Sequence, residues 1–304
     1  MILEEKRDQV IENIQRATAR GEFNVCVEPD DPTPSADERK ALRERFLRRF
    51  PTMRFRACNY AARAIAGTVT ALVNRKTPVY GIEKVAEIQG GAIVTSNHFS
   101  PVDNTVVRTF LRQVGKRYMP VVGSEVNLAM PGLFGFLMNY ADIIPISTNP
   151  DYMKHDFESL LGSRLSAGEY VLMYPEQEMW FNYRKPRPCK RGTYYYAALF
   201  NVPIISCFVE IRDLDELEAP NFMEVSYAMH VLDPIYPDPE KTVRENSVIM
   251  CERDYKQKVA AYEAAYGKKL DYRFSVDDIA GWVPPVTAVD KVRAMYSGDL
   301  CKSV

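Results

Sequence analysis

The alternation of short apolar runs with helical stretches between residues 92 and 209 is the feature that most constrains the fold. Strands separated by helices pair in parallel, because each helix returns the chain to the same edge of the sheet. Functional side chains then gather where strands end and helices begin. The apolar runs cover residues 92–95, 118–122, 143–146, 170–174 and 203–209. The pattern predicts an α/β fold with a mostly parallel central sheet flanked by helices.

The rest of the sequence divides the chain into four segments. A proline-rich acidic stretch at residues 28–35 marks the clearest boundary, since clustered prolines interrupt helices and strands. Apolar periodicity predicts helices at residues 1–20, 37–50, 54–74, 193–201 and 243–266. We expect an N-terminal helix and linker (1–35), a basic amphipathic helical segment (36–77), an α/β core (78–240) and a C-terminal helical extension (241–304).

One motif places an imidazole and a carboxylate five residues apart, directly after a predicted strand: Asn97-His98-Phe99-Ser100-Pro101-Val102-Asp103. Ser100 is a good N-cap and Pro101 suits the first helical position, so Asp103 is predicted in the first turn of a helix. A carboxylate on one ring nitrogen fixes the tautomer and leaves the other nitrogen free to accept a proton from a hydroxyl. The same residues also fit a capping box, in which Asp103 only bonds the backbone of the N-cap.

Residues 78–234 resemble the glycerolipid acyltransferases of the lysophosphatidic acid acyltransferase type, whose four short blocks follow in order. Residues 97–103 match each specified position of the first block, Asn-His-x-Ser-x-x-Asp. The third block, usually Phe-Pro-Glu-Gly-Thr, is present as Tyr-Pro-Glu-Gln-Glu at 174–178 and is followed by Lys-Arg-Gly at 190–192. The fourth block is Val-Pro-Ile-Ile-Ser at 202–206. The second block, at 141–148, lacks the arginine that the family uses against the acceptor's phosphate.

The resemblance implies an O-acyltransferase that moves a fatty acyl group from acyl-CoA or acyl carrier protein to a hydroxyl of a lysolipid or glycerolipid-like acceptor. It implies that His98 is the general base and that Asp103 orients it, with no metal and no cofactor beyond the thioester co-substrate. The expected substrate-binding residues are Asn97, Ser100, Glu176, Gln177, Glu178, Lys190, Arg191 and Gly192.

The head group of the acceptor is a separate question. The missing arginine of the second block, together with Gln177 and Glu178, favours a less anionic head group than that of lysophosphatidate. A cluster of bases offers an alternative grip on a phosphate of the acceptor, of coenzyme A or of phosphopantetheine. These bases are Arg184, Lys185, Arg187, Lys190 and Arg191.

Two other functions fit the same sequence. The dyad of His98 and Asp103 is also suited to a thioester or lipid hydrolase that activates water. A catalytically silent membrane- or lipid-binding protein of the same fold is the second alternative. The formal net charge of -1 argues against a nucleic-acid partner, because no global positive field gathers phosphates.

Residues 39–76 carry eleven basic residues against one glutamate, with phenylalanines among them. Such a segment is attracted to anionic head groups and predicts contact with a membrane surface, although a solvated basic helix packed on the domain fits as well. The apolar stretch at 130–140 is predicted to be a core helix, with an acyl-chain tunnel or lipid contact as the alternative.

Scattered cysteines and a charged N-terminus favour a reducing compartment and no signal peptide. No stretch is long and apolar enough to span a bilayer by sequence alone. We expect a cytoplasmic protein that associates peripherally with the inner face of the membrane.

Overall fold

The computed structural model describes residues 4–29 and 31–284. In this part of the chain one sheet has the strand order β1-β7-β6-β2-β5-β3-β4. Strands β6, β2, β5, β3 and β4 are mutually parallel, whereas β7 is antiparallel to β6 and carries β1 parallel to itself. The predicted mostly parallel sheet is therefore confirmed. The strands are β1 Val79–Tyr80, β2 Ala92–Thr95, β3 Val121–Ser124, β4 Ile143–Ile146, β5 Tyr170–Met173, β6 Ile204–Ala219 and β7 Phe222–Val231.

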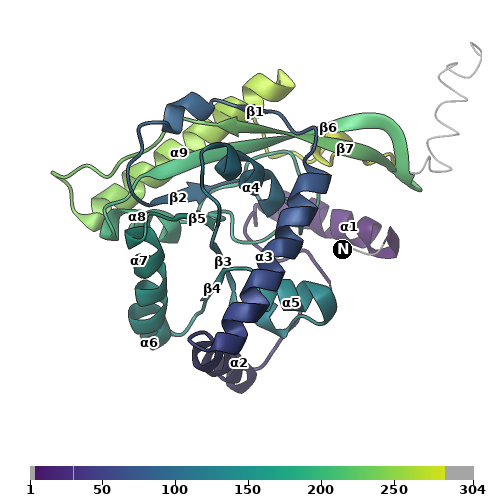
Figure 1. The fold of residues 1–304 in the computed structure, drawn as a ribbon. Coiled ribbons are helices and arrows are strands. Elements are labelled where there is room, and N and C mark those ends of the chain that lie inside the picture. Colours follow the sequence, from purple (N-terminus) through teal and green to yellow (C-terminus); the bar gives the residue numbers. More distant parts are fainter. Residues whose placement is uncertain (1–3, 30, 285–304) are drawn as a thin grey trace, which may run out of the picture.

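Helices cover both faces of the sheet (Figure 1), and the alternation of side chains along each strand explains why. Val94 and Leu172 pack with α4 on one face, while Ile93 and Val171 pack with α7, α8 and α9 on the other. Helix α3 lies on α4 and α5, and α2 lies on the short turn before α5. The helices are α1 Glu4–Arg20, α2 Ala36–Arg49, α3 Met53–Val73, α4 Asn104–Gln113, α5 Gly132–Tyr140, α6 Pro150–Tyr152, α7 Glu158–Ser166, α8 Gly192–Leu199 and α9 Val243–Tyr266. Shorter helical turns are η1 Ile82–Val85, η2 Glu125–Ala129, η3 Met153–Phe157 and η4 Val276–Asp278.

The predicted helices outside the core are confirmed, and their ends have clear local causes. A capping box joins Thr242 to Glu245 at the start of α9, and Gly267 ends the helix in the left-handed conformation at φ 65. Ser35 and Glu38 make the same box at the start of α2, immediately after the proline-rich stretch. These signals lie within four residues of one another, which is why they can be read from sequence.

Three predicted elements are placed differently. Helix α4 begins at Asn104 rather than at Pro101, because residues 101–103 form a separate turn. The strand expected at 118–122 lies at Val121–Ser124. The strand expected at 203–209 continues to Ala219, because β7 pairs with it as the second arm of a hairpin. Exposed acidic residues along 212–218 hide this extension, since they lack the alternating burial of a half-buried strand.

The apolar stretch at 130–140 forms α5, most of whose residues are half-buried. Gly135 is the buried residue of this helix, and Leu133 is 63% exposed. No helix among the described residues is long and apolar enough to cross a membrane.

Sheet register brings the two most informative sequence blocks together. Thr95, the last residue of β2, is paired with Met173, the last residue of β5. Parallel strands end at the same edge of a sheet, so the loops that follow β2 and β5 begin side by side. His98 follows the first of these strands and Tyr174 the second.

A buried cluster of polar groups lies beneath the end of β2. The Lys258 ammonium, fully buried in α9, donates to Asp254 Oδ2 at 2.6 Å and to Thr95 Oγ1 at 2.9 Å. Tyr194 of α8 also donates to the Asp254 carboxylate. The cluster therefore ties two helices to the strand that leads into the loop with His98.

We expect Lys258→Met to lower the free energy of unfolding by about 3–5 kcal/mol, because it leaves the Asp254 carboxylate buried without a counter-charge. Urea denaturation measures the change. The double variant Lys258→Met/Asp254→Leu removes both charges and should recover most of the loss. Equal destabilisation by the single and double variants would show that packing, rather than charge pairing, dominates at this position.

Candidate active site

His98 and Asp103 form a hydrogen-bonded dyad in the loop after β2. His98 Nδ1 donates to Asp103 Oδ2 at 2.7 Å, so the proton on the neutral ring is held at Nδ1 and Nε2 has a free lone pair. The His98 side chain is 21% exposed, whereas that of Asp103 is 2% exposed. The base is thus accessible while its carboxylate partner is shielded.

The Asp103 carboxylate also organises the turn that carries His98. Its Oδ2 accepts from the backbone N–H of Phe99 at 2.9 Å and of Ser100 at 3.3 Å. The Ser100 hydroxyl accepts from Val102 N at 3.3 Å instead of capping α4. The capping interpretation of Asp103 is therefore correct in part, but the same oxygen that bonds the turn also bonds the imidazole.

Tyr174, which occupies the usual phenylalanine position of the third block, completes the surroundings of the dyad. Its ring is stacked on the imidazole of His98, with ring centroids 3.9 Å apart and an angle of 13° between the planes. Its hydroxyl donates to Asp103 Oδ1 at 2.6 Å. Sequence reasoning did not select Tyr174, although its departure from phenylalanine was the available signal.

Asn97 lies behind the dyad and is 2% exposed. Its side-chain amide donates to Val209 O at 3.0 Å and accepts from Val209 N at 2.8 Å. Ser100 is also buried. Both residues, expected to bind substrate, have their hydrogen bonds directed into the protein, where they hold the His98 loop.

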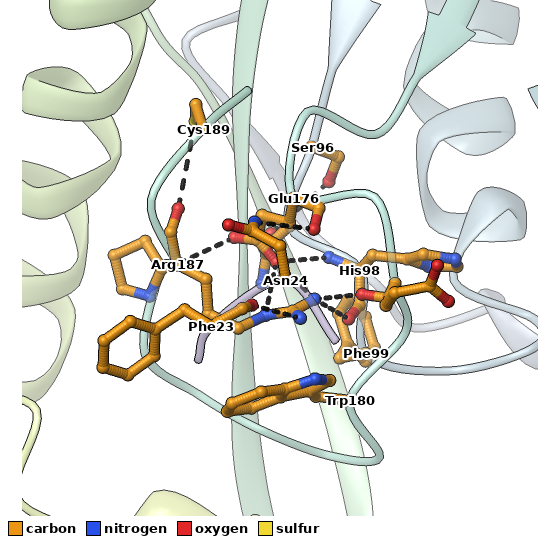
Figure 2. A network of polar contacts seen from close by, with 12 residues as sticks. Phe23, Asn24, Ser96, His98, Phe99, Glu176, Trp180, Arg187 and Cys189 are labelled. Atoms are coloured by element: carbon orange, nitrogen blue, oxygen red, sulfur yellow. Dashed lines mark hydrogen bonds and ion pairs between the residues drawn. The ribbon is translucent and has the colours of Figure 1, made fainter. Parts of the chain in front are cut away.

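Glu176 is buried and its carboxylate is directed away from solvent (Figure 2). It accepts from the backbone N–H of His98 at 3.3 Å and from that of Arg187 at 2.9 Å. It also makes an ion pair with the Arg187 guanidinium, with Nη2 and Oε2 2.9 Å apart. Arg187 in turn donates to the carbonyl oxygens of His98 at 3.3 Å, Phe23 at 3.1 Å and Glu178. The pair therefore joins both backbone groups of His98 to the loop after β5.

A segment from the N-terminus braces this loop (Figure 2). The side-chain amide of Asn24 donates to Glu176 O at 3.0 Å and to Pro188 O at 2.9 Å. Trp180 Nε1 donates to Val25 O at 3.0 Å, and the Arg187 guanidinium lies 4.7 Å from the Trp180 ring centroid. Nothing in the sequence pattern relates residues 23–25 to the third block, because their contact depends on the tertiary fold.

Gln177 and Glu178 lie on the outer side of the same turn. Gln177 has φ 70 in the left-handed region, which suits the glycine that the family usually carries there. The turn is thus retained without the glycine. The Glu178 carboxylate has no hydrogen-bond partner among the described residues, and burial, reinforced by the charge of Asp31, raises its pKa above the ordinary value. His98 is close enough to act on it electrostatically.

The basic cluster after the third block divides into two groups. Arg184, Lys185 and Arg187 are buried and bonded to internal partners, so the structure contradicts their expected availability to a substrate phosphate. Lys190 and Arg191 are exposed at the start of α8, where Gly192 is the first residue. Lys190 N donates to Pro175 O at 2.8 Å, which keeps this group beside the loop with Glu176.

Among the described residues one group has metal-ligand proximity: Cys26, Asp31 and Glu178 offer atoms within 4.8 Å of one another. Burial, followed by the charge of Asp31, raises the pKa of Cys26 to about 12. Cys26 and Asp31 are exposed, and exposed acidic groups often lie close together without a metal, so we assign no metal site here.

We expect Glu176→Gln to destabilise the protein by about 3–5 kcal/mol, because it leaves the Arg187 guanidinium buried without a counter-charge. Glu178→Gln is the matched control two residues away. Since the folded-state pKa of Glu178 is raised, the wild type loses stability as the pH rises through that pKa. The Glu178→Gln variant should be the more stable one at pH 7 and equal to wild type below the ordinary pKa of 4.5 in urea denaturation. A loss of stability with Glu178→Gln and none with Glu176→Gln would contradict this assignment.

Residues 76–210 match the model of the Acyltransferase family. Among solved structures, the chain is similar to the 1-acyl-sn-glycerophosphate (LPA) acyltransferase PlsC from Thermotoga maritima, with 14% sequence identity and a TM-score of 0.48, over 88% of this chain and 99% of that chain. None of the curated proteins matches the chain. The family match covers both members of the dyad and the whole loop from Tyr174 to Gly192, which confirms the resemblance described from the sequence. The similarity of the chain to the Acyltransferase family thus extends over residues 76–210.

Proposed function

We propose that this protein transfers a fatty acyl group from an acyl thioester, of CoA or acyl carrier protein, to a hydroxyl of a lysophospholipid or glycerolipid-like acceptor. One observation carries the proposal. Asp103 Oδ2 is hydrogen-bonded to Nδ1 of His98 at 2.7 Å, while the imidazole remains partly exposed. This arrangement leaves Nε2 of the imidazole to accept a proton from an incoming hydroxyl. Neither nucleophilic side chain nor covalent enzyme intermediate is required.

In the proposed reaction His98 Nε2 accepts the hydroxyl proton as the acceptor oxygen attacks the thioester carbonyl carbon. The carbon–sulfur bond then breaks, and the imidazolium returns its proton to the departing thiolate. Asp103 stabilises the imidazolium electrostatically between these two events. The products are an ester and a free thiol, so atoms and charge balance without a further reactant.

Glu176 and Arg187 hold the base in position for this reaction. Their ion pair bonds the backbone N–H and the carbonyl of His98, which restricts the loop that carries the base. Asn97 restricts the same loop from the side of β6. These residues are proposed as the framework of the site rather than as contacts to the acceptor.

The charges that remain near His98 favour a less anionic acceptor than lysophosphatidate. Arg184, Lys185 and Arg187 are committed to internal partners, and the unpaired carboxylate close to the imidazole is that of Glu178. Gln177 and Glu178 are proposed to contact acceptor hydroxyls. Lys190, Arg191 and the backbone at Gly192 are proposed to hold the phosphates of the thioester donor, because they are exposed beside the same loop.

We also propose that α3 rests on a membrane surface. From Ala57 to Val73 its exposed residues are apolar or small, and the large exposed side chains of the helix include Met53, Tyr60 and Leu72 at 74%, 66% and 73% exposure. Exposed bases flank both ends of the helix, at Arg54 and Arg75 among others. An apolar helix face with basic ends suits an anionic interface.

The neighbouring α2 makes a different use of its apolar and basic residues. Its Phe46 is buried with Phe55 and Leu128, and its Arg43 pairs with Glu125 at 2.6 Å. Within residues 36–77, we therefore assign the membrane contact to α3.

Thiol release from an acyl thioester tests the reaction, measured with lysophosphatidate, glycerol 3-phosphate and neutral lysolipids as separate acceptors. We expect acceptor-dependent release that favours neutral lysolipids and falls about 10²- to 10⁴-fold in His98→Ala. His155→Ala is the matched control, because His155 is exposed and distant in sequence from the site.

Other outcomes of this assay identify the alternatives. Free fatty acid without an acylated product would indicate a hydrolase that uses the same dyad. Absence of thiol release with both donors, in a protein that still binds vesicles, would indicate a lipid-binding protein. Preference for lysophosphatidate would overturn the head-group proposal alone.

Sedimentation with vesicles that contain anionic lipids tests the membrane contact. We expect Leu72→Glu to weaken partitioning about tenfold or more, because it removes an exposed apolar side chain that the proposed contact would bury in the interface and adds a repelled charge. Leu217→Glu is the control, since Leu217 is 72% exposed on the β6–β7 hairpin. Equal effects of the two variants would contradict a contact through α3.

A further inference from the structure

Tyr174 makes two contacts with the dyad. A phenylalanine at this position would make only the first of them, the ring stacking. The ring stacks on His98 at 3.9 Å between centroids, and the hydroxyl donates to Asp103 Oδ1 at 2.6 Å. The stacking needs only the aromatic ring. The hydroxyl is an addition with its own chemical consequence.

Among the described residues, the Tyr174 hydroxyl is the group that donates to Oδ1 of Asp103. The other oxygen, Oδ2, accepts from His98, Phe99 and Ser100. A donor on the second oxygen draws negative charge away from the first. Burial, followed by the charge of Asp103, raises the pKa of the Tyr174 hydroxyl well above its ordinary value. The hydroxyl therefore remains a donor throughout the range in which an imidazole titrates.

We propose that Tyr174 is a positioning residue that sets the pH range in which His98 is an effective base, by sharing the Asp103 carboxylate with it. This proposal rests on the proposed function for its kinetic readout. A carboxylate that is partly neutralised by a hydrogen bond stabilises an imidazolium less. His98 then loses its proton at a lower pH, and the imidazolium formed in the reaction returns its proton more readily to the leaving thiolate.

The other charged or titratable groups around the dyad come from several elements. The Glu176–Arg187 pair bonds the backbone of His98, and Glu178 acts on the ring from the loop after β5. Arg108 of α4 interacts electrostatically with the Tyr174 hydroxyl. Tyr227 of β7 is hydrogen-bonded to Ser100 and interacts electrostatically with Asp103. None of these groups donates to Asp103 Oδ1, so removal of the Tyr174 hydroxyl leaves each of them in place.

Tyr174→Phe removes the hydroxyl alone and keeps the stacked ring. The ring proton resonances of His98 report its titration by NMR, with the assignment taken from comparison with His98→Asn. We expect the titration midpoint to rise by about 0.5 to 1 pH unit in Tyr174→Phe. The acid limb of the kcat/KM profile should move upward by the same amount.

Tyr152→Phe is the matched control. Tyr152 is a buried tyrosine whose hydroxyl donates to Pro145 O at 2.7 Å, distant in sequence from the dyad. Its loss should cost similar stability and leave the His98 midpoint unchanged. Tyr174→Leu removes the stacked ring as well and should lower kcat beyond the effect of Tyr174→Phe.

An unchanged His98 midpoint in folded Tyr174→Phe would overturn the proposal, as would an equal rise in Tyr152→Phe. The NMR titration needs no substrate, so it tests the role of Tyr174 even if wild type releases no thiol. In that case the proposed acyl transfer would be wrong, and the NMR titration would still show whether Tyr174 is coupled to the dyad.

Discussion

The buried ion pair between Glu176 and Arg187 is the interaction on which the candidate site depends. It bonds both the N–H and the carbonyl of His98, and it also reaches Phe23 at the N-terminal end of the chain. Burying two charges is costly unless further hydrogen bonds satisfy them, and here each remaining donor of Arg187 has an acceptor. The pair thereby joins three segments into one frame: the loop after β2, the loop after β5 and the segment that contains Phe23.

This frame explains why the site needs segments that lie outside the α/β core. Helix α1 buries Val10 and Ile14 against Trp180, while Asn24 closes the loop after β5 with two hydrogen bonds. The loop after β2, which carries His98, is thus supported from beneath by the sheet and from the side by the N-terminal segment. Precise placement of a general base requires such support, because small displacements reduce the rate steeply.

The pairing of buried charges also determines which charges remain exposed around the site. Most of the bases after the third block neutralise internal carboxylates, which leaves Lys190 and Arg191 exposed. The dyad is held by neutral donors and by Tyr174, so its electrostatics depend on hydrogen bonds more than on nearby ions. Helix α3 packs on α4 and α5 and keeps an exposed face within the described part of the chain, which is the face proposed to contact a membrane.

Local sequence was sufficient for the helices outside the core and for the pairing of His98 with Asp103. Helix caps, strand alternation and the spacing from His98 to Asp103 act over a few residues, so α9 was predicted at its observed bounds and the dyad was predicted with its partner. Sequence could not show that Glu176 is directed inward and Glu178 outward, since both follow the same proline. That choice is made by Arg187 and by the N-terminal segment, whose contacts depend on desolvation and on partners 164 residues away in the chain. Local order therefore specifies which groups are present, whereas tertiary packing decides which of them are buried as framework and which stay free to react.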